Sequence, residues 1–254
     1  MSEIVLVTGA SAGFGQAIVA KLVSDGYKVI GAARRLEKLK ELERQFGSEH
    51  FYALQMDVSS RSTVDAALSQ LSEKWQKIDI LINNAGLALG LDKAYEANFD
   101  DWITMINTNI VGLTYLTHKL LPQMIERNKG TIINLGSTAG TIPYPGANIY
   151  GASKAFVKQF SLNLRADVAG KNIRVTNIEP GLCEGTEFSS VRFKGDKERV
   201  KSLYEGAHAI RPIDIANTVS WVIAQPAHLN INRIEMMPVS QSYGPQPVYR
   251  DTKF

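Results

Sequence analysis

Apolar, strand-like runs alternate with amphipathic stretches along most of the chain. This alternation is typical of βαβ units, in which helices cover a parallel sheet. The predicted strands are Ile4–Thr8, Tyr27–Ala33, Phe51–Val58, Ile78–Asn83, Thr131–Ser137, Ile173–Ile178 and Arg233–Met237. The predicted helices are Phe14–Ser24, Leu36–Phe46, Thr63–Gln76, Phe99–Arg127, Ile149–Ala169 and Ile213–Ala224. Ser60 can cap the third helix, and Pro122 is expected to bend the fourth. We therefore expect an α/β fold with a parallel sheet, in a single domain that spans residues 1–254.

Two segments do not follow this alternation. Residues 181–211 mix apolar, charged and glycine positions without a clear period, and we expect them to form a lobe that covers a substrate. Residues 238–254 are rich in Pro, Gly and Tyr, and we expect an irregular tail there.

Charge and composition argue against several classes of protein. The formal net charge is +3, and the basic residues of segment 34–41 alternate with glutamates, which is typical of a solvated helix face rather than a nucleic-acid site. No run approaches the roughly 18 apolar residues of a membrane span. Cys183 is the only cysteine, so no intrachain disulfide can form, and we expect a cytoplasmic protein. The four histidines are scattered without ligand spacing, so we expect no metal site.

A glycine-rich turn follows the first predicted strand and opens the first helix. Its glycines permit a tight turn and a close approach of the backbone to a pyrophosphate, and the helix amides then point at the phosphates. An ordinary turn is the alternative, but the position between strand and helix is the context that dinucleotide binding requires. The residues expected to bind are Gly9, Ser11, Ala12, Gly13, Phe14 and Gly15.

The second predicted strand runs into Arg34 and Arg35, and no acidic residue occurs before Glu37. An NAD site in such a fold usually has Asp or Glu near this point, where it accepts hydrogen bonds from the ribose. Two guanidinium groups can instead bind a 2′-phosphate through charge-assisted hydrogen bonds. A solvated first turn of the next helix is the alternative. The arginines favour NADP(H) as the cofactor.

Polar and small residues follow the third and fourth predicted strands, where ligands of open α/β sheets bind. Asp57 can accept a hydrogen bond from the adenine amino group. Asn84, with the small residues Ala85 and Gly86, can pack against the adenosine ribose. An ordinary turn is the alternative at each position.

Tyr150 and Lys154 are four residues apart at the expected start of a helix, so their side chains share one face. A free tyrosine has a pKa of about 10. A nearby ammonium and an oxidised nicotinamide ring both favour the phenolate and lower this pKa. Tyr150 can then exchange a proton with an alcohol or a ketone near neutral pH. The spacing alone is common by chance, so the prediction depends on the other motifs.

Ser137 and Asn109 are two further polar candidates. Ser137 ends the fifth predicted strand, and its hydroxyl can donate a hydrogen bond to a substrate oxygen as negative charge develops there. Asn109 lies in an apolar part of the long predicted helix, where an unsatisfied polar group is costly. We expect Asn109 to hold a water that connects Lys154 to solvent. A simple exposed Asn is the alternative.

Together these motifs resemble the short-chain dehydrogenase/reductase family. The matching positions, in the family's order and spacing, are Thr8, Gly9, Gly13, Gly15, Asn83, Asn84, Ala85, Gly86, Asn109, Ser137, Tyr150, Lys154, Pro180 and Gly181. The resemblance implies a Rossmann-type, doubly wound parallel sheet of about seven strands, an Asn–Ser–Tyr–Lys catalytic tetrad and a homotetramer built on the two long helices. It also implies that Lys154 binds the nicotinamide ribose and that Pro180 and Gly181 contact the cofactor. Thr186, expected at the nicotinamide carboxamide, stands one position later than is common in the family.

A narrower resemblance links the chain to the NADP-dependent 3-hydroxy acid dehydrogenases. It rests on segments 84–90, 136–140, 179–182, 185–188, 191–196 and 235–238. That branch oxidises serine, allo-threonine and 3-hydroxypropionate-type substrates, and in reverse it reduces malonic semialdehyde. Such substrates carry a carboxylate, which a guanidinium matches well. Arg192, in the predicted lobe, is our candidate for this contact, and a surface Arg is the alternative.

The sequence thus predicts an NADP-dependent oxidoreductase for small 3-hydroxy acids, with a small-molecule substrate and no nucleic-acid or membrane partner. One alternative is a reductase of the same family that acts on acyl thioesters, sugars or steroids. The other is an inactive NADP-binding sensor. The presence of both Tyr150 and Lys154 argues against the sensor.

Overall fold

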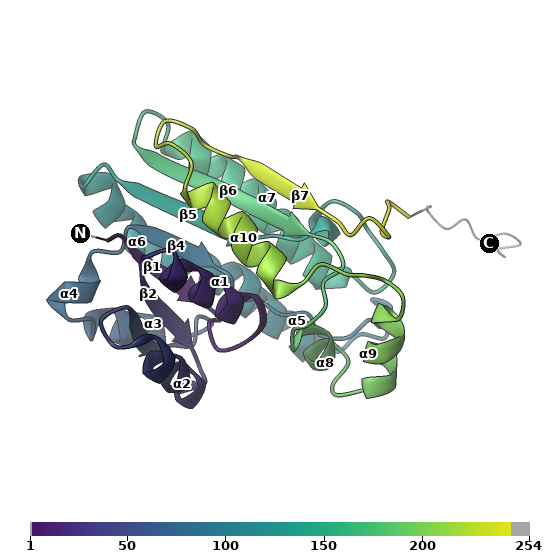
Figure 1. Cartoon of the computed structure of the whole chain (residues 1–254). Coiled ribbons are helices and arrows are strands. Elements are labelled where there is room, and N and C mark those ends of the chain that lie inside the picture. The colour runs from purple at the N-terminus through teal and green to yellow at the C-terminus, as the bar shows by residue number, and fades with distance from the viewer. Residues whose placement is uncertain (1, 245–254) are drawn as a thin grey trace, which may run out of the picture.

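The computed structural model describes residues 2–244 and contains a parallel sheet of seven strands (Figure 1). The strands are β1 Ile4–Thr8, β2 Lys28–Ala33, β3 Phe51–Gln55, β4 Ile80–Asn83, β5 Gly130–Leu135, β6 Ile173–Pro180 and β7 Arg233–Met236. Their order across the sheet is β3-β2-β1-β4-β5-β6-β7. The chain therefore changes its direction of winding between β1 and β4, which is where ligands bind in such sheets. The predicted α/β, doubly wound fold is confirmed.

Helices cover both faces of the sheet (Figure 1). They are α1 Gly13–Ser24, α2 Leu36–Phe46, α3 Arg61–Ser69, α4 Glu73–Gln76, α5 Phe99–Ile106, α6 Leu113–Glu126, α7 Asn148–Asp167, α8 Phe188–Arg192, α9 Lys197–Tyr204 and α10 Pro212–Ile223. Side chains of α1, α2 and α10 share one buried cluster with the sheet, and those of α3, α6 and α7 share the other. The strands are thus apolar on both faces, as expected of a buried parallel sheet.

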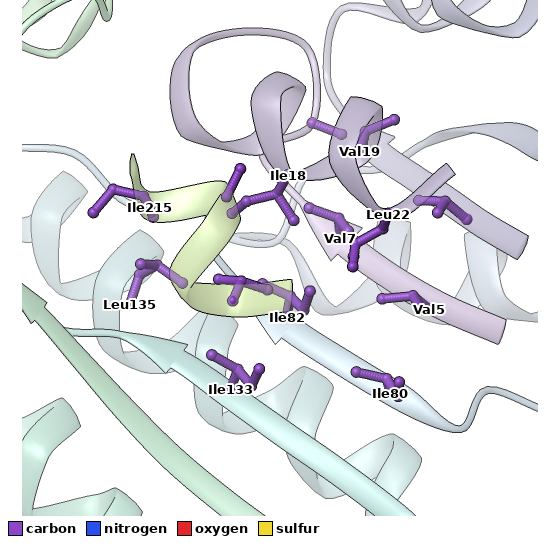
Figure 2. Close-up of a cluster of buried hydrophobic side chains, with 14 of the residues drawn as sticks. Val5, Val7, Ile18, Val19, Leu22, Ile80, Ile82, Ile133, Leu135 and Ile215 are labelled. Atoms are coloured by element: carbon purple, nitrogen blue, oxygen red, sulfur yellow. The ribbon is translucent and has the colours of Figure 1, made fainter. Parts of the chain in front are cut away.

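Alternation along β1 divides its side chains between the two layers. Val5 and Val7 pack with Ile18 and Leu22 of α1, and Figure 2 shows them on the same side of the sheet as Ile215 of α10. Ile4 and Leu6 belong to the opposite cluster. Burial of each such side chain contributes about 1.5–3 kcal/mol. This packing fixes the carboxyl end of β1, from which the glycine-rich turn departs.

The third predicted helix, Thr63–Gln76, is wrong as a single element. Helix α3 ends at Ser69 and a short helix, α4, begins at Glu73. The break lets Leu71 and Trp75 both enter the same buried cluster. The cap is confirmed, because the Ser60 hydroxyl oxygen accepts a 3.5 Å hydrogen bond from the Thr63 amide.

The predicted helix Phe99–Arg127 is also divided. A π-helical turn at Asn107–Gly112 separates α5 from α6, whereas Pro122 lies inside α6. Close packing accompanies the wider turn, since a Cβ on Gly112 would lie 2.7 Å from the Val58 carbonyl oxygen. π-Helical turns often occur at functional sites, and this one carries Asn109.

The segment 181–211 contains α8 and α9 and stands near the carboxyl ends of the strands (Figure 1). A parallel bridge between Cys183 and Ile210 joins its two ends. Residues 238–244 form neither helix nor strand, as predicted, and the rest of the predicted tail lies outside the described residues. Within residues 2–244, no helix has the length and apolar character needed to cross a membrane.

Candidate active site

A cleft of about 760 Å³ lies between the carboxyl ends of the strands and the lobe 181–211. Its lining includes most of the predicted site residues: Gly9, Ser11, Ala12, Gly13, Phe14, Arg34, Arg35, Asp57, Asn84, Ala85, Gly86, Ser137, Tyr150, Lys154, Pro180, Gly181, Thr186 and Arg192. Gly15 and Asn109 are the two predicted residues outside this lining. The fold therefore gathers residues from almost the whole length of the chain around one space.

The glycine-rich turn needs its glycines for two different reasons. Gly9 and Gly13 have φ angles of 68° and 55°, a region that residues with a Cβ rarely adopt. Gly15 lies inside α1, and a Cβ there would be 2.2 Å from the Gly9 carbonyl oxygen. Gly15 therefore allows the helix to pack on the turn, which explains its position outside the lining.

Arg34 and Arg35 line the same end of the cleft but differ in their partners. Arg35 donates from Nε and Nη2 to the Ser11 hydroxyl oxygen at 3.1 and 3.0 Å. Its Nη2 also lies 2.8 Å from a carboxylate oxygen of Glu187. The Arg34 guanidinium, by contrast, makes no hydrogen bond or ion pair within the described residues. One arginine is thus held in place, while the other is available.

Asn84 and Asp57 are tied to neighbouring backbone. The Asn84 amide nitrogen Nδ2 donates to the carbonyl oxygens of Thr8 and Gly9 at 2.7 and 3.5 Å. Asn84 therefore supports the start of the glycine-rich turn, a contact the sequence did not reveal. One oxygen of Asp57 accepts from the amide and hydroxyl of Ser59 at 3.0 and 2.7 Å.

Tyr150 lies near the start of α7, buried against Phe188 with the ring centres 5.6 Å apart. Burial raises the pKa of Tyr150 to about 12, against the effect of a hydrogen bond with the Ser137 side chain. Tyr144 raises this pKa further, whereas the nearby Arg192 lowers it. The lowered pKa expected from the sequence is therefore not a property of the protein alone.

Lys154 lies one helical turn after Tyr150, as the spacing predicted. Its ammonium is 5.9 Å from the Tyr150 ring centre and donates a 2.7 Å hydrogen bond to the Leu135 carbonyl oxygen. Burial lowers the pKa of Lys154 from 10.5 to about 8. Such a group can gain or lose a proton near neutral pH.

Asn109 is 2% exposed, so the exposed-Asn alternative is wrong. Its Oδ1 accepts from the Leu87 amide and its Nδ2 donates to the Leu87 carbonyl oxygen, both at 2.9 Å. Nδ2 also donates to the Ser153 hydroxyl at 3.0 Å. A Cβ on Gly86 would lie 3.3 Å from Asn109 Oδ1 and 3.4 Å from Lys154 Nζ. Both side chains therefore border the space beside Gly86, and the water expected there stays a prediction.

The structure places Arg192, at the end of α8, inside the cleft beside Tyr150. Its guanidinium carbon lies 5.5 Å from the ring centres of both Tyr144 and Tyr150. Nε donates to the Gly90 carbonyl oxygen and Nη2 to the Tyr144 hydroxyl, each at 3.1 Å. The simple surface-Arg alternative is therefore wrong.

The other predicted residues lie where the lobe begins. The Pro180 carbonyl oxygen accepts a 3.4 Å hydrogen bond from the Ser137 hydroxyl. The Gly181 amide donates to the Met236 carbonyl oxygen at 2.8 Å. Thr186 lies against the glycine-rich turn, since a Cβ on Gly13 would be 3.1 Å from the Thr186 side chain. Despite its shifted position, Thr186 thus reaches the cleft.

The lining residues missed from the sequence include three polar ones whose contacts shape the site: Tyr144, Glu187 and Gln241. Tyr144 stands between two prolines, which indicates a turn but not the contact with Arg192. Gln241 Oε1 accepts a 2.7 Å hydrogen bond from the Leu182 amide, so residues near the chain's end help to position the start of the lobe. No local pattern predicts these long-range contacts.

Two kinds of chemistry find no support in the described part of the chain. No group of three or more His, Cys, Asp or Glu side chains that could hold a metal ion occurs in residues 2–244. Burial raises the pKa of the Cys183 thiol to about 12, which disfavours the reactive thiolate.

Known proteins with similar sequences and structures identify the family of this chain. The sequence model of the family described as short chain dehydrogenase matches residues 3–197. An NADP-dependent 3-hydroxy acid dehydrogenase of Escherichia coli (strain K12) is 54% identical over 247 residues, which cover 97% of this chain and 99% of that protein. Serine 3-dehydrogenase of Rhizobium radiobacter is 50% identical over 252 residues, which cover 99% of this chain and 100% of that protein. The solved closed form of a serine dehydrogenase complexed with NADP+ is 54% identical, with a TM-score of 0.96 and coverage of 98% of this chain and 100% of that one. The chain belongs to the short chain dehydrogenase family, as the resemblance in its motifs predicted.

Proposed function

We propose that this protein transfers a hydride between NADP(H) and a small 3-hydroxy acid or the corresponding 3-oxo acid. The substrate class is that of serine, allo-threonine and 3-hydroxypropionate. The observation that carries the proposal is the Arg192 guanidinium, 5.5 Å from the Tyr150 ring centre. A cation beside the proton-transfer residue suits a substrate whose carboxylate is close to the reacting hydroxyl. The names of the relatives from Escherichia coli and Rhizobium radiobacter support the same class.

The cleft fits NADP(H). Its volume of about 760 Å³ lies within the range of cofactor sites, and Gly9 and Gly13, whose φ angles are positive, line it with the tight backbone turn that suits a pyrophosphate. We assign the 2′-phosphate to Arg34, Arg35 and Ser11. Asp57 is assigned to the adenine, with Asn84, Ala85 and Gly86 beside the ribose. The nicotinamide end is assigned to Pro180, Gly181, Thr186 and Lys154.

The protein's own groups carry the proton chemistry. When bound, the nicotinamide supplies or accepts the hydride. Tyr150 takes the proton of the alcohol in oxidation and returns it to the carbonyl oxygen in reduction. Ser137 donates a hydrogen bond to that oxygen as charge develops. Lys154, with a pKa of about 8, exchanges protons along the space beside Gly86, which Asn109 borders.

Arg192 holds the substrate carboxylate in this proposal. Its hydrogen bonds to Gly90 and Tyr144 fix the plane of the guanidinium. Nη1 makes no hydrogen bond within the described residues and is free to donate to a carboxylate. A neutral acyl thioester, sugar or steroid has no group that needs this cation, which favours the 3-hydroxy acids over the other reductase classes.

Three further predictions go with this function. We propose one catalytic domain over residues 1–254 with its substrate lobe at 181–211, a homotetramer built on the two long helical regions, and a cytoplasmic location. Apolar side chains exposed on α5 and α7, such as Phe99 and Phe156, support a partner subunit on those helices. Light scattering coupled to size exclusion tests the tetramer.

Initial rates with NADP and with NAD test the proposed function. The panel contains L-serine, D-serine, L-allo-threonine, 3-hydroxypropionate and a neutral secondary alcohol, with malonic semialdehyde in the reverse direction. We expect turnover of the 3-hydroxy acids with a strong preference for NADP. Turnover of the neutral alcohol alone would discard the substrate class, and NADPH binding without any turnover would indicate a sensor.

A further inference from the structure

Glu187 faces Arg35 at the end of the cleft near the glycine-rich turn. Nη1 of Arg35 donates to Oε1 of Glu187 at 3.1 Å, and Nη2 lies 2.8 Å from Oε2. Both carboxylate oxygens thus meet both terminal nitrogens of the guanidinium. A guanidinium offers this same pair of donors to a phosphate. Glu187 therefore occupies the donors that we assign to the 2′-phosphate.

The pair connects two parts of the site that lie 152 residues apart in the sequence. Arg35 follows β2, at the cofactor end of the cleft, whereas Glu187 directly precedes α8. The last residue of α8 is Arg192, which lies beside Tyr150. One short helix thus has the Arg35 contact at its start and the proposed carboxylate-binding cation at its end.

The contact can exchange. The side chains of Arg35 and Glu187 are 45% and 49% exposed, so water competes for the pair. The ammonium of Lys38 lies 3.7 Å from Oε1 of Glu187 and offers the carboxylate a second partner. The Glu187 carboxylate also repels a phosphate dianion. A site that served only to bind the 2′-phosphate would have no use for this negative charge.

We propose that Glu187 limits the preference for NADP(H) over NAD(H) by competing with the 2′-phosphate of NADP(H) for Arg35. This inference rests on the proposed role of Arg35 in binding that phosphate. In the free enzyme, the Glu187–Arg35 ion pair connects the lobe 181–211 to the cofactor end of the cleft. When NADP(H) binds, its phosphate takes the two terminal nitrogens of Arg35, and Glu187 turns to Lys38. NAD(H) has no 2′-phosphate, so the Glu187–Arg35 ion pair stays intact when NAD(H) binds.

The test is the Kd of NADPH and of NADH, measured by nicotinamide fluorescence at low ionic strength for wild type, Glu187→Gln and Glu37→Gln. Glu37 is a matched control, because it lies on α2, pairs with Lys40 at 3.6 Å and makes no hydrogen bond or ion pair with the Arg35 side chain. Glu187→Gln should lower the Kd of NADPH about two- to fivefold, since exposed ion pairs are weak. The Kd of NADH should change less than twofold, and Glu37→Gln should change neither.

Three results would overturn the competition: an unchanged Kd of NADPH in Glu187→Gln, a raised one, or equal tightening in Glu37→Gln. Arg35→Ala separates this outcome from failure of the proposed cofactor site. It should raise the Kd of NADPH about tenfold or more while sparing NADH, and Glu187→Gln should have no effect in its background. If Arg35→Ala leaves NADPH binding unchanged, the phosphate role itself fails. If Arg35→Ala weakens NADPH binding but Glu187→Gln does not strengthen it, only the competition fails.

Discussion

The ammonium of Lys154 donates a 2.7 Å hydrogen bond to the carbonyl oxygen of Leu135, the last residue of β5. Within residues 2–244, the Lys154 ammonium makes this one hydrogen bond. Burial lowers the pKa of Lys154 to about 8. A buried charge without an opposite charge beside it is costly. Burial of the charged Lys154 side chain therefore lowers the stability of the fold.

Replacing Lys154 with Met should stabilise the fold at pH 7 by about 1–3 kcal/mol and abolish turnover. At pH 7 the lysine is protonated in both the folded and the unfolded chain, so the full cost of burying the charge is present. Between a pKa of about 8 in the folded state and 10.5 in the unfolded chain, the unfolded chain binds more protons. Wild type thus gains stability as the pH rises, and the advantage of Met shrinks.

Urea unfolding of wild type and Lys154→Met at several values between pH 7 and 9.5 measures this difference. Lys171→Met serves as a control, because Lys171 is exposed. A Lys154→Met protein that is less stable than wild type at pH 7, by an amount independent of pH, would contradict the interpretation.

Gly86→Ala should lower kcat about tenfold or more, because proton transfer depends on the space beside this residue. The added methyl would lie 3.3 Å from Asn109 Oδ1 and 3.4 Å from Lys154 Nζ. Steady-state kinetics in H2O and D2O check this prediction, since a blocked proton route should increase the solvent isotope effect. Gly244→Ala is the control, as no atom of residues 2–244 lies within 4 Å of its added Cβ. An unchanged kcat would show that protons do not pass through the space beside Gly86.

Tyr150→Phe should reduce kcat by about a thousandfold or more while NADPH still binds within a few-fold of wild type. In the proposed mechanism the hydroxyl is the proton-transfer group, whereas the ring of the variant retains its packing on Phe188. In wild type, kcat/KM for oxidation should rise with pH, because oxidation requires the phenolate. Stopped-flow kinetics measures turnover, and equilibrium titration measures NADPH binding. Substantial activity in Tyr150→Phe would assign proton transfer to another group.

Arg34→Ala should raise the KM for NADP about tenfold or more and leave the KM for NAD nearly unchanged. The Arg34 guanidinium has no partner within residues 2–244, so its removal breaks no internal contact. Any loss therefore reports on the bound cofactor. Equal increases for both cofactors would place the 2′-phosphate elsewhere.

Local patterns sufficed for the strands and for most of the site. Most predicted site residues lie at the end of a predicted strand or the start of a predicted helix. The glycine-rich turn and the pair Arg34 and Arg35 follow strands, and Tyr150 and Lys154 begin a helix. The π-helical turn around Asn109 was missed, because it depends on packing against Val58 and Leu87. The Arg35–Glu187 pair was missed for a similar reason, since it joins segments that only the folded lobe brings together.

The most direct test of the proposed substrate class is the KM of Arg192→Ala and of Arg192→Lys, each measured with L-allo-threonine and with a neutral secondary alcohol. Loss of a charge-assisted hydrogen bond should raise the KM for the hydroxy acid about tenfold or more in Arg192→Ala, with partial recovery in Arg192→Lys. The neutral alcohol should change about threefold or less, because it has no carboxylate to lose the contact. Since Arg192 also binds Gly90 and Tyr144, the ratio of the two effects is the decisive quantity. Equal effects on both substrates would contradict a carboxylate held by Arg192.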